Sequence, residues 1–215
     1  MGLEERKQEE QNRRRERMLD AAESLFLRLG YTAATMDQIA AEAGFTKRTV
    51  YGYFAGKEAL LGGVILRGLD ALNELTARLQ AGQTSGIGRA WACGQAFFRF
   101  QRDKPGLCTL FQREKPGHCT CFRTGRLLSG GQEGMSVPLA AALQEASARN
   151  LGFLMSAIRD GQADGTIRKE LEPQSTAILI QFISGGILES IGMAGQPGAV
   201  EVPGGGPVRR VGRET

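Results

Sequence analysis

The chain has 215 residues, of which 41% are hydrophobic and 23% are charged, and its formal net charge is +4 at pH 7. This length suits one small and one medium domain, each with a buried core. No apolar run reaches the roughly 18 residues that a membrane-spanning helix needs, and no apolar segment of the signal-peptide kind follows the charged N-terminal residues. We therefore expect a cytoplasmic protein without a membrane partner.

The N-terminal residues 2–17 are almost wholly polar, and the run Arg13-Arg14-Arg15 lies near their end. One interpretation is a flexible arm that contacts nucleic-acid phosphates or a minor groove beside a main binding site. The other is a solvated, partly helical extension of the helix that follows. We assign residues 1–13 to a flexible polar arm and leave its role open between the two.

A first amphipathic helix is predicted after this arm. Apolar residues recur from Met18 to Leu29 at i, i+3, i+4, i+7, i+8 and i+11, which is one stripe at a helical period. Charged residues such as Asp20 and Glu23 lie off this stripe. Gly30 is the expected left-handed residue that ends the helix.

Two short helices joined by a glycine turn are predicted next. Thr35 and Gln38 have the spacing of a capping box, which predicts a helix that begins after Thr35. Gly44 suits the turn, because a positive φ is easily adopted only by glycine. Thr46 then caps a third helix, whose inward side includes Val50. The pattern is typical of a helix-turn-helix.

The outward face of the third helix carries basic and aromatic groups. Such side chains at the start of a recognition helix reach base edges in the major groove, while flanking groups bind phosphates. A bidentate pair between Arg48 and guanine would give roughly 1–3 kcal/mol of discrimination. The backbone amides at the start of the second helix also suit an anion. The candidate DNA-binding residues are Thr35, Lys47, Arg48, Thr49, Tyr51, Tyr53 and Lys57.

Residues 30–61, GYTAATMDQIAAEAGFTKRTVYGYFAGKEALL, resemble the N-terminal domain of the TetR family of bacterial transcriptional regulators. The resemblance rests on Tyr31, on the T-M-x-x-I-A-x-x-A-G run of residues 35–44 and on V-Y-x-Y-F-x-x-K-E-x-L over residues 50–60. It implies an all-α fold in which a three-helix helix-turn-helix DNA-binding domain, residues 14–72, is joined to a helical ligand-binding and dimerisation domain. It also implies a homodimer on double-stranded operator DNA, and usually repression relieved by a small-molecule effector. Gly52 departs from the pattern, because many relatives carry a larger residue there.

The second domain, residues 73–191, is predicted to be helical. We expect helices from residue 57 to about 79, across residues 91–100, from 138 to about 160, and from 173 to about 191. Residues 192–215 are rich in glycine and proline, which predicts a disordered tail. Relatives in the family usually have a further helix there, so the dimer interface is either reduced or built differently.

Large apolar side chains of this domain could line a pocket for an apolar ligand. The candidates are Trp91, Phe97, Phe98, Phe100, Phe111, Phe153 and Met155. For each of them an ordinary core position is the competing interpretation. The last helix is apolar on more than one face, which favours burial against a second subunit. The candidate dimer residues are Ile180, Ile183, Ile187 and Ile191.

A second hypothesis concerns the cysteines. Cys108, His118, Cys119 and Cys121 could sense a metal or an oxidant, with Cys93 as an alternative ligand. Their spacing matches no standard zinc motif, so we assign no metal site and no cofactor. The sequence has one histidine and lacks a nucleophile motif or a phosphate-binding glycine loop, which argues against an enzyme.

Overall fold

The computed structural model describes residues 2–107 and 136–194, with the backbone alone over residues 185–194. The predicted all-α fold is confirmed, since the described part of the chain contains helices and no strand. The helices are α1 (Leu3–Leu29), α2 (Met36–Ala43), α3 (Lys47–Tyr53), α4 (Lys57–Ala81), α5 (Gly86–Asp103), α8 (Val137–Asp164) and α9 (Pro173–Ala194). Within these residues no helix has the length and apolarity needed to span a membrane.

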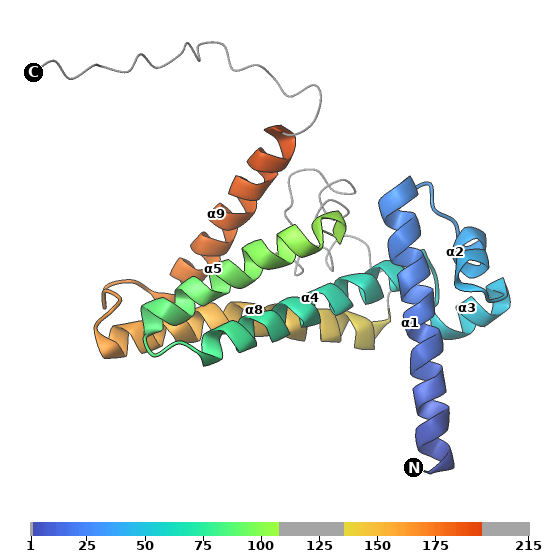
Figure 1. Cartoon of the computed structure of the whole chain (residues 1–215), viewed down its shortest axis with the longest axis horizontal. Helices are drawn as coiled ribbons and strands as arrows, with labels where there is room; N and C mark the ends of the chain where they lie inside the picture. Colours follow the sequence, from blue (N-terminus) through green and yellow to red (C-terminus); the bar gives the residue numbers. More distant parts are fainter. Residues whose placement is uncertain (1, 108–135, 195–215) are drawn as a thin grey trace, which may run out of the picture.

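Figure 1 shows two groups of helices that meet where α4 passes α1. The small group holds α2 and α3 against one side of α1. In the larger group α4, α5 and α8 lie side by side, and α9 packs on α8 and then diverges from α5. The helix α4 belongs to both groups, so it connects the helix-turn-helix to the rest of the molecule.

The helix α1 begins at Leu3, so the flexible arm predicted for residues 1–13 is wrong from that residue on. Ion pairs of the i, i+4 kind line this segment, with 3.9 Å between Arg13 and Glu9 and 2.8 Å between Arg14 and Glu10. Such pairs stabilise an exposed helix modestly. The helical extension, which the sequence left open as an alternative, is the observed conformation.

The caps predicted around the turn are confirmed. Thr35 accepts a hydrogen bond from the Gln38 N–H at 3.3 Å, and the Gln38 side chain accepts one from the Thr35 N–H at 2.9 Å. Gly44 ends α2 with φ of 73°. Thr46 accepts a bond from the Thr49 N–H at 3.2 Å and so starts α3. Local sequence therefore determines where α2 begins and ends and where α3 begins.

The core runs from α1 through α4 into the larger group. Met18, Phe26, Ile39, Val50 and Leu60 are each at most 1% exposed. The predicted long helices of the second domain are also observed. One boundary differs: α9 continues to Ala194, three residues into the segment assigned to the disordered tail. The remaining tail residues lie outside the described part of the chain.

Candidate functional site

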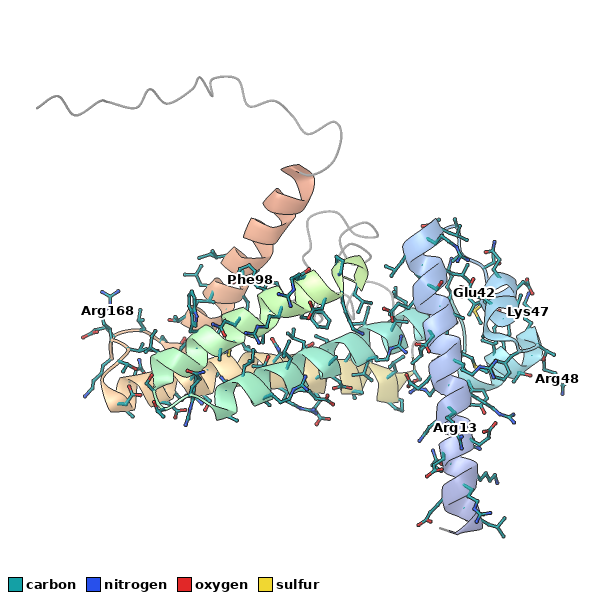
Figure 2. The ribbon with its side chains drawn as sticks, in the orientation of Figure 1. Arg13, Glu42, Lys47, Arg48, Phe98 and Arg168 are labelled. Carbon is teal, nitrogen blue, oxygen red and sulfur yellow. The ribbon has the colours of Figure 1, made fainter. Side chains whose placement is uncertain are left out.

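The outer face of α3 is a basic surface that no other described element covers. Val50 is fully buried, so the opposite side of this short helix must face solvent. Arg48 lies on that side, Lys47 and Tyr51 are exposed beside it, and Figure 2 shows Lys47 and Arg48 at the outer edge of the small helix group. Arg48 forms no hydrogen bond or ion pair with any described residue. Its guanidinium is therefore free to bind an external acceptor.

Lys47 is held in place by the first turn of α2. Its Nζ lies 2.8 Å from an Asp37 carboxylate oxygen, and the hydrogen bond to Asp37 raises the pKa of Lys47. Both side chains are mainly exposed, with 51% and 68% of their surface accessible. An ion pair in solvent is weak and can exchange for another anion. Lys47 is thus a charged lysine whose present partner is replaceable.

The four remaining hydroxyl candidates differ in how accessible they are. The Thr35 and Thr49 hydroxyls contribute to caps, and the Thr49 hydroxyl lies 2.8 Å from that of Thr46. Tyr51 is 47% exposed. Tyr53 is only partly exposed and packs against the core of the helix-turn-helix. Tyr51 is therefore the most available of these four.

Lys57 has a structural role that the sequence did not reveal. Its ammonium donates to the carbonyls of Tyr31, Thr32 and Ala34 at 2.7, 3.2 and 2.9 Å. It also lies 4.4 Å from the centre of the Tyr31 ring. An ammonium has three donors, so all of them are used. The predicted phosphate contact of Lys57 is not supported by this geometry, because the carbonyls of the α1–α2 loop occupy the group.

Arg17 is a residue of the helix-turn-helix that sequence reasoning missed. Its guanidinium donates to the carbonyl of Ala43 at 2.9 Å and lies 4.8 Å from the centre of the Phe45 ring. It therefore satisfies a carbonyl at the end of α2 and covers the aromatic residue after the turn. Because Arg17 follows a run of arginines, the sequence suggested a solvated charge. The one feature that indicated otherwise is its position directly before Met18, the first residue of the apolar stripe.

Arg67 joins the two groups of helices. From α4 it pairs with three carboxylates of α1, those of Glu16 at 3.1 Å, Asp20 at 2.6 Å and Glu23. Partial burial would lower the pKa of Arg67, but the hydrogen bonds to Asp20, Glu23 and Glu16 outweigh it and raise the pKa. A guanidinium with five donors can hold several acceptors in a fixed geometry. The Arg67 cluster thus ties α4 to α1.

A cavity of about 590 Å³ lies among α4, α5, α8 and α9. Its wall is mainly apolar, and its largest side chains come from α5. This volume lies in the range of small-molecule sites. The lining residues are Leu72, Thr76, Ser85, Ile87, Gly88, Ala90, Trp91, Cys93, Gly94, Phe97, Phe98, Asn150, Leu154, Ile180, Gln181 and Ser184.

Three of the predicted pocket residues line this cavity: Trp91, Phe97 and Phe98. Figure 2 shows Phe98 where α5 meets α9. Phe100 is not among the residues that line this cavity and packs in the main core, so its assignment to the pocket was wrong.

On α8 the lining residues are Asn150 and Leu154. Phe153 and Met155, the neighbours of Leu154 in the chain, do not line the cavity. Phe111 lies outside the described residues.

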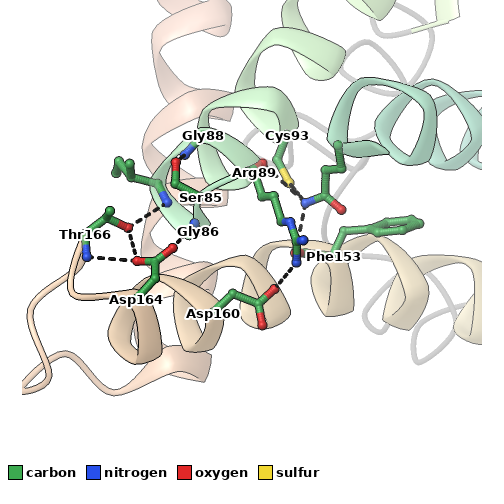
Figure 3. Close-up of polar contacts among 11 residues, drawn as sticks. Ser85, Gly86, Gly88, Arg89, Cys93, Phe153, Asp160, Asp164 and Thr166 are labelled. Atoms are coloured by element: carbon green, nitrogen blue, oxygen red, sulfur yellow. Dashed lines mark hydrogen bonds and ion pairs between the residues drawn. The ribbon is translucent and has the colours of Figure 1, made fainter. Parts of the chain in front are cut away.

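The first turn of α5, at one end of the cavity, is fixed to the end of α8 (Figure 3). The Asp164 carboxylate accepts hydrogen bonds from the Gly86 N–H at 2.6 Å and from Thr166. The bonds from Thr166 and then from Gly86 lower the pKa of Asp164. Arg89 and Asp160 form an adjacent ion pair at 2.5 Å. These contacts make the α5–α8 end of the cavity rigid.

The predicted dimer residues lie on the outer side of α9 as far as the structure describes them. Ile180 and Ile183 are 40% and 53% exposed, and Ile180 also lines the cavity. Neighbouring Leu179 and Phe182 are 58% and 54% exposed. The side chains of Ile187 and Ile191 lie outside the described part. A monomer rarely leaves so many adjacent apolar side chains in water.

The cysteine hypothesis concerns residues that are mostly outside the structure. Cys108, His118, Cys119 and Cys121 lie beyond the described residues. Cys93 is described, and burial raises its pKa to about 11. Its Sγ accepts a hydrogen bond from Gln80 at 3.2 Å. Within the described ranges no three potential ligands come together to hold a metal ion.

Comparisons with known proteins identify the N-terminal domain. Residues 18–64 match the family model of bacterial regulatory proteins of the tetR family. The chain is 38% identical over 77 residues to the HTH-type transcriptional regulator SrpR of Pseudomonas putida, covering 36% of this chain and 34% of SrpR. It is 37% identical over 87 residues to the HTH-type transcriptional activator FasR of Mycolicibacterium smegmatis, covering 40% of each. These matches thus span well under half of either relative.

The fold of the described chain is similar to solved structures over most of its length. FadR of Bacillus subtilis, solved in complex with stearoyl-CoA, aligns with a TM-score of 0.65 at 18% identity, covering 83% of this chain and 87% of FadR. The ketosteroid regulator KstR2 of Mycobacterium tuberculosis aligns with a TM-score of 0.59 at 19% identity, covering 91% and 86%. Residues 18–64 therefore form a helix-turn-helix domain of the tetR family of bacterial regulatory proteins, and the fold of the described chain is similar to that of solved regulators.

Proposed function

We propose that this protein is a homodimeric, sequence-specific repressor that leaves its operator when a small apolar molecule binds in the cavity. The observation that carries the proposal is Arg48, whose guanidinium has no partner among the described residues. It lies at the start of an exposed recognition helix with a formed N-cap and a buried inner face. Arg48 pairs with guanine in the major groove, and Lys47 exchanges Asp37 for a phosphate.

Two copies pair through the apolar side of α9 in this proposal. Its support is the exposure of Leu179, Phe182 and Ile183 on one helix. A two-fold pair brings the same surface of each subunit together and directs two α3 helices at two half-sites. Their spacing then has to match about one turn of DNA.

Release follows a path along α4. Leu72 and Thr76 of α4 line the cavity, and Arg67 binds α1 from the same helix. At 1.5 Å per residue, Leu72 and Arg67 are about 8 Å apart along the axis. A ligand that shifts α4 moves α1 and the helix-turn-helix with it, and a coupling of roughly 1–3 kcal/mol is ordinary for such devices.

Selection from a random DNA library tests the operator part of this proposal. The full-length protein is incubated with the library at moderate salt, and bound fragments are sequenced over successive rounds. We expect enrichment of two inverted half-sites, and loss of one conserved guanine per half-site with Arg48→Met. A library that stays random after repeated rounds would contradict sequence-specific binding.

A further inference from the structure

The cavity wall has no charged side chain among its described residues. Near the α5–α8 end of the cavity, Arg89 and Asp160 form an ion pair with 2.5 Å between the guanidinium nitrogen and the carboxylate oxygen. Both residues line a neighbouring depression and not the cavity itself. An ion taken from water into an apolar site without a partner is strongly disfavoured. The wall therefore disfavours a ligand that carries a charge on the part that enters.

Most polar groups of the wall are already used within the protein. The Thr76 hydroxyl donates to the carbonyl of Leu72 at 2.8 Å, and the Ser85 hydroxyl accepts from the Gly88 N–H at 3.2 Å as the cap of α5. The Cys93 Sγ accepts from Gln80. The polar groups left for a ligand are the Trp91 indole N–H at the exposed side of the cavity and the Asn150 and Gln181 amides, with the Ser184 hydroxyl one helical turn from Gln181.

Asn150 belongs to a chain of amides that crosses three helices. On α4, Asn73 donates to the carbonyl of Ala146 at 2.9 Å, and its Oδ1 accepts from the Asn150 Nδ2 at 2.9 Å. On α9, the Gln181 Nε2 reaches the Asn150 Oδ1 at 3.4 Å, longer than an ordinary N–H···O bond. Asn150 is 9% exposed and Asn73 is 3% exposed. The weakest bond of the chain is thus the one at the cavity.

We propose that the effector is an uncharged molecule with an apolar body and one hydroxyl or carbonyl group, which binds between Gln181 and Asn150. A carbonyl accepts from the Gln181 Nε2, and a hydroxyl can also donate to the Asn150 Oδ1. Either replaces the long amide–amide bond, and the Asn150–Asn73 bond links that change to α4. This inference rests on the proposed function, since it names the ligand class of the same cavity.

The only tryptophan of the chain, Trp91, lines the cavity and reports binding directly. Three probes with the same chain length and different charge are decan-1-ol, decanoate and decylammonium. Each is titrated at pH 7, the alcohol below its solubility limit and the two ions below their micelle-forming concentrations. We expect decan-1-ol to change Trp91 fluorescence at a concentration at least about tenfold lower than either ion. Equal or tighter binding of decanoate or decylammonium, or no response to any probe, would overturn the proposal.

Variants separate the amide pair from general apolar binding. Gln181→Leu and Asn150→Leu should each weaken decan-1-ol binding about five- to tenfold, the loss of one or two hydrogen bonds. Gln174→Leu is the control, because Gln174 lies on α9, is exposed and does not line the cavity. Because Asn73→Leu keeps both ligand-facing amides, it leaves decan-1-ol affinity within about twofold. An unchanged affinity in Gln181→Leu would reject the amide pair as the recognition element.

The two proposals fail in different ways. Preferential binding of decan-1-ol without any change in DNA affinity would uphold the ligand class and contradict effector-driven release. Release from DNA by decanoate, with no response to decan-1-ol, would uphold effector-driven release and contradict the uncharged ligand class.

Discussion

At the scale of single residues, similar cations around the helix-turn-helix have different roles. Arg48 is exposed and has no partner in the described part of the chain, while Lys57 is surrounded by three carbonyls and an aromatic ring. Arg17 likewise binds the end of α2. The distinction between a DNA contact and a structural cation depends on what faces each charge, which residue type alone does not reveal.

The pair Arg48→Met and Lys57→Met tests this distinction. Lys57→Met removes charge-assisted bonds to three carbonyls, so we expect the free energy of unfolding to fall by about 2–3 kcal/mol. Arg48→Met should change it by less than about 0.5 kcal/mol. Urea denaturation followed by circular dichroism measures both. A Lys57→Met protein as stable as wild type would restore the phosphate-contact interpretation.

Cys93 should react as a buried thiol. Its pKa of about 11 leaves it protonated at neutral pH, so iodoacetamide at pH 7.5 should modify it about twentyfold more slowly than free cysteine. The rate should keep rising beyond pH 9, where an exposed thiol levels off. In the unfolded chain this thiol loses its proton near pH 9, whereas in the folded protein it keeps the proton up to about pH 11. Deprotonation therefore favours the unfolded chain, and the free energy of unfolding falls as pH rises from about 9 to about 11.

The measurement uses a variant in which Cys108, Cys119 and Cys121 are replaced by serine, so that Cys93 is the only thiol. Mass spectrometry gives the rate at each pH. A rate that levels off near pH 9 would show that Cys93 is a solvent-accessible, reactive thiol.

At the scale of elements, the features that nearby residues encode could be predicted from the sequence, and the contacts between residues far apart in the chain could not. The capping box at Thr35 and the turn at Gly44 are encoded within a few residues, so α2 and α3 were predictable. The start of α1 was not, because its charge pairs resemble those of a solvated arm. Phe100 and Phe153 were misassigned because hydrophobicity does not tell which side of a helix faces a cavity. The Arg67 cluster joins residues about fifty positions apart, which no local pattern shows.

The crossing of α5 and α8 is the tightest helix contact of the second domain. A Cβ built on Gly86 would lie 1.9 Å from the backbone nitrogen of Gly161. We expect Gly86→Ala to separate the helices and to reduce the free energy of unfolding by about 2 kcal/mol. Gly94→Ala is a matched control on α5, since a Cβ there meets nothing within 4 Å. Equal stability of the two variants in thermal denaturation would contradict the close crossing.

At the scale of the whole molecule, α4 connects a DNA-facing unit to a cavity, and α9 presents an apolar side to solvent. If two copies pair through α9, DNA affinity depends on both recognition helices binding at once. Losing the second site removes an avidity that is typically 100-fold or more. In such a dimer, operator affinity falls whenever the two subunits separate.

Ile183→Glu tests this dependence. A carboxylate in the middle of the α9 surface should convert a dimer to a monomer in sedimentation velocity and should weaken operator binding at least about 100-fold. Val137→Glu is the control, since Val137 is 83% exposed at the start of α8. A dimeric Ile183→Glu protein would place the subunit contact elsewhere.

The most direct test of the central claim is a fluorescence-anisotropy titration of the selected operator and a scrambled duplex at two salt concentrations. We expect wild-type protein to prefer the operator and to bind more weakly at higher salt, because phosphate contacts release counterions. Arg48→Met should lose at least about tenfold for the operator and little for the scrambled duplex. Equal binding of both duplexes by wild type, or an Arg48→Met protein with unchanged preference, would contradict a recognition role for α3.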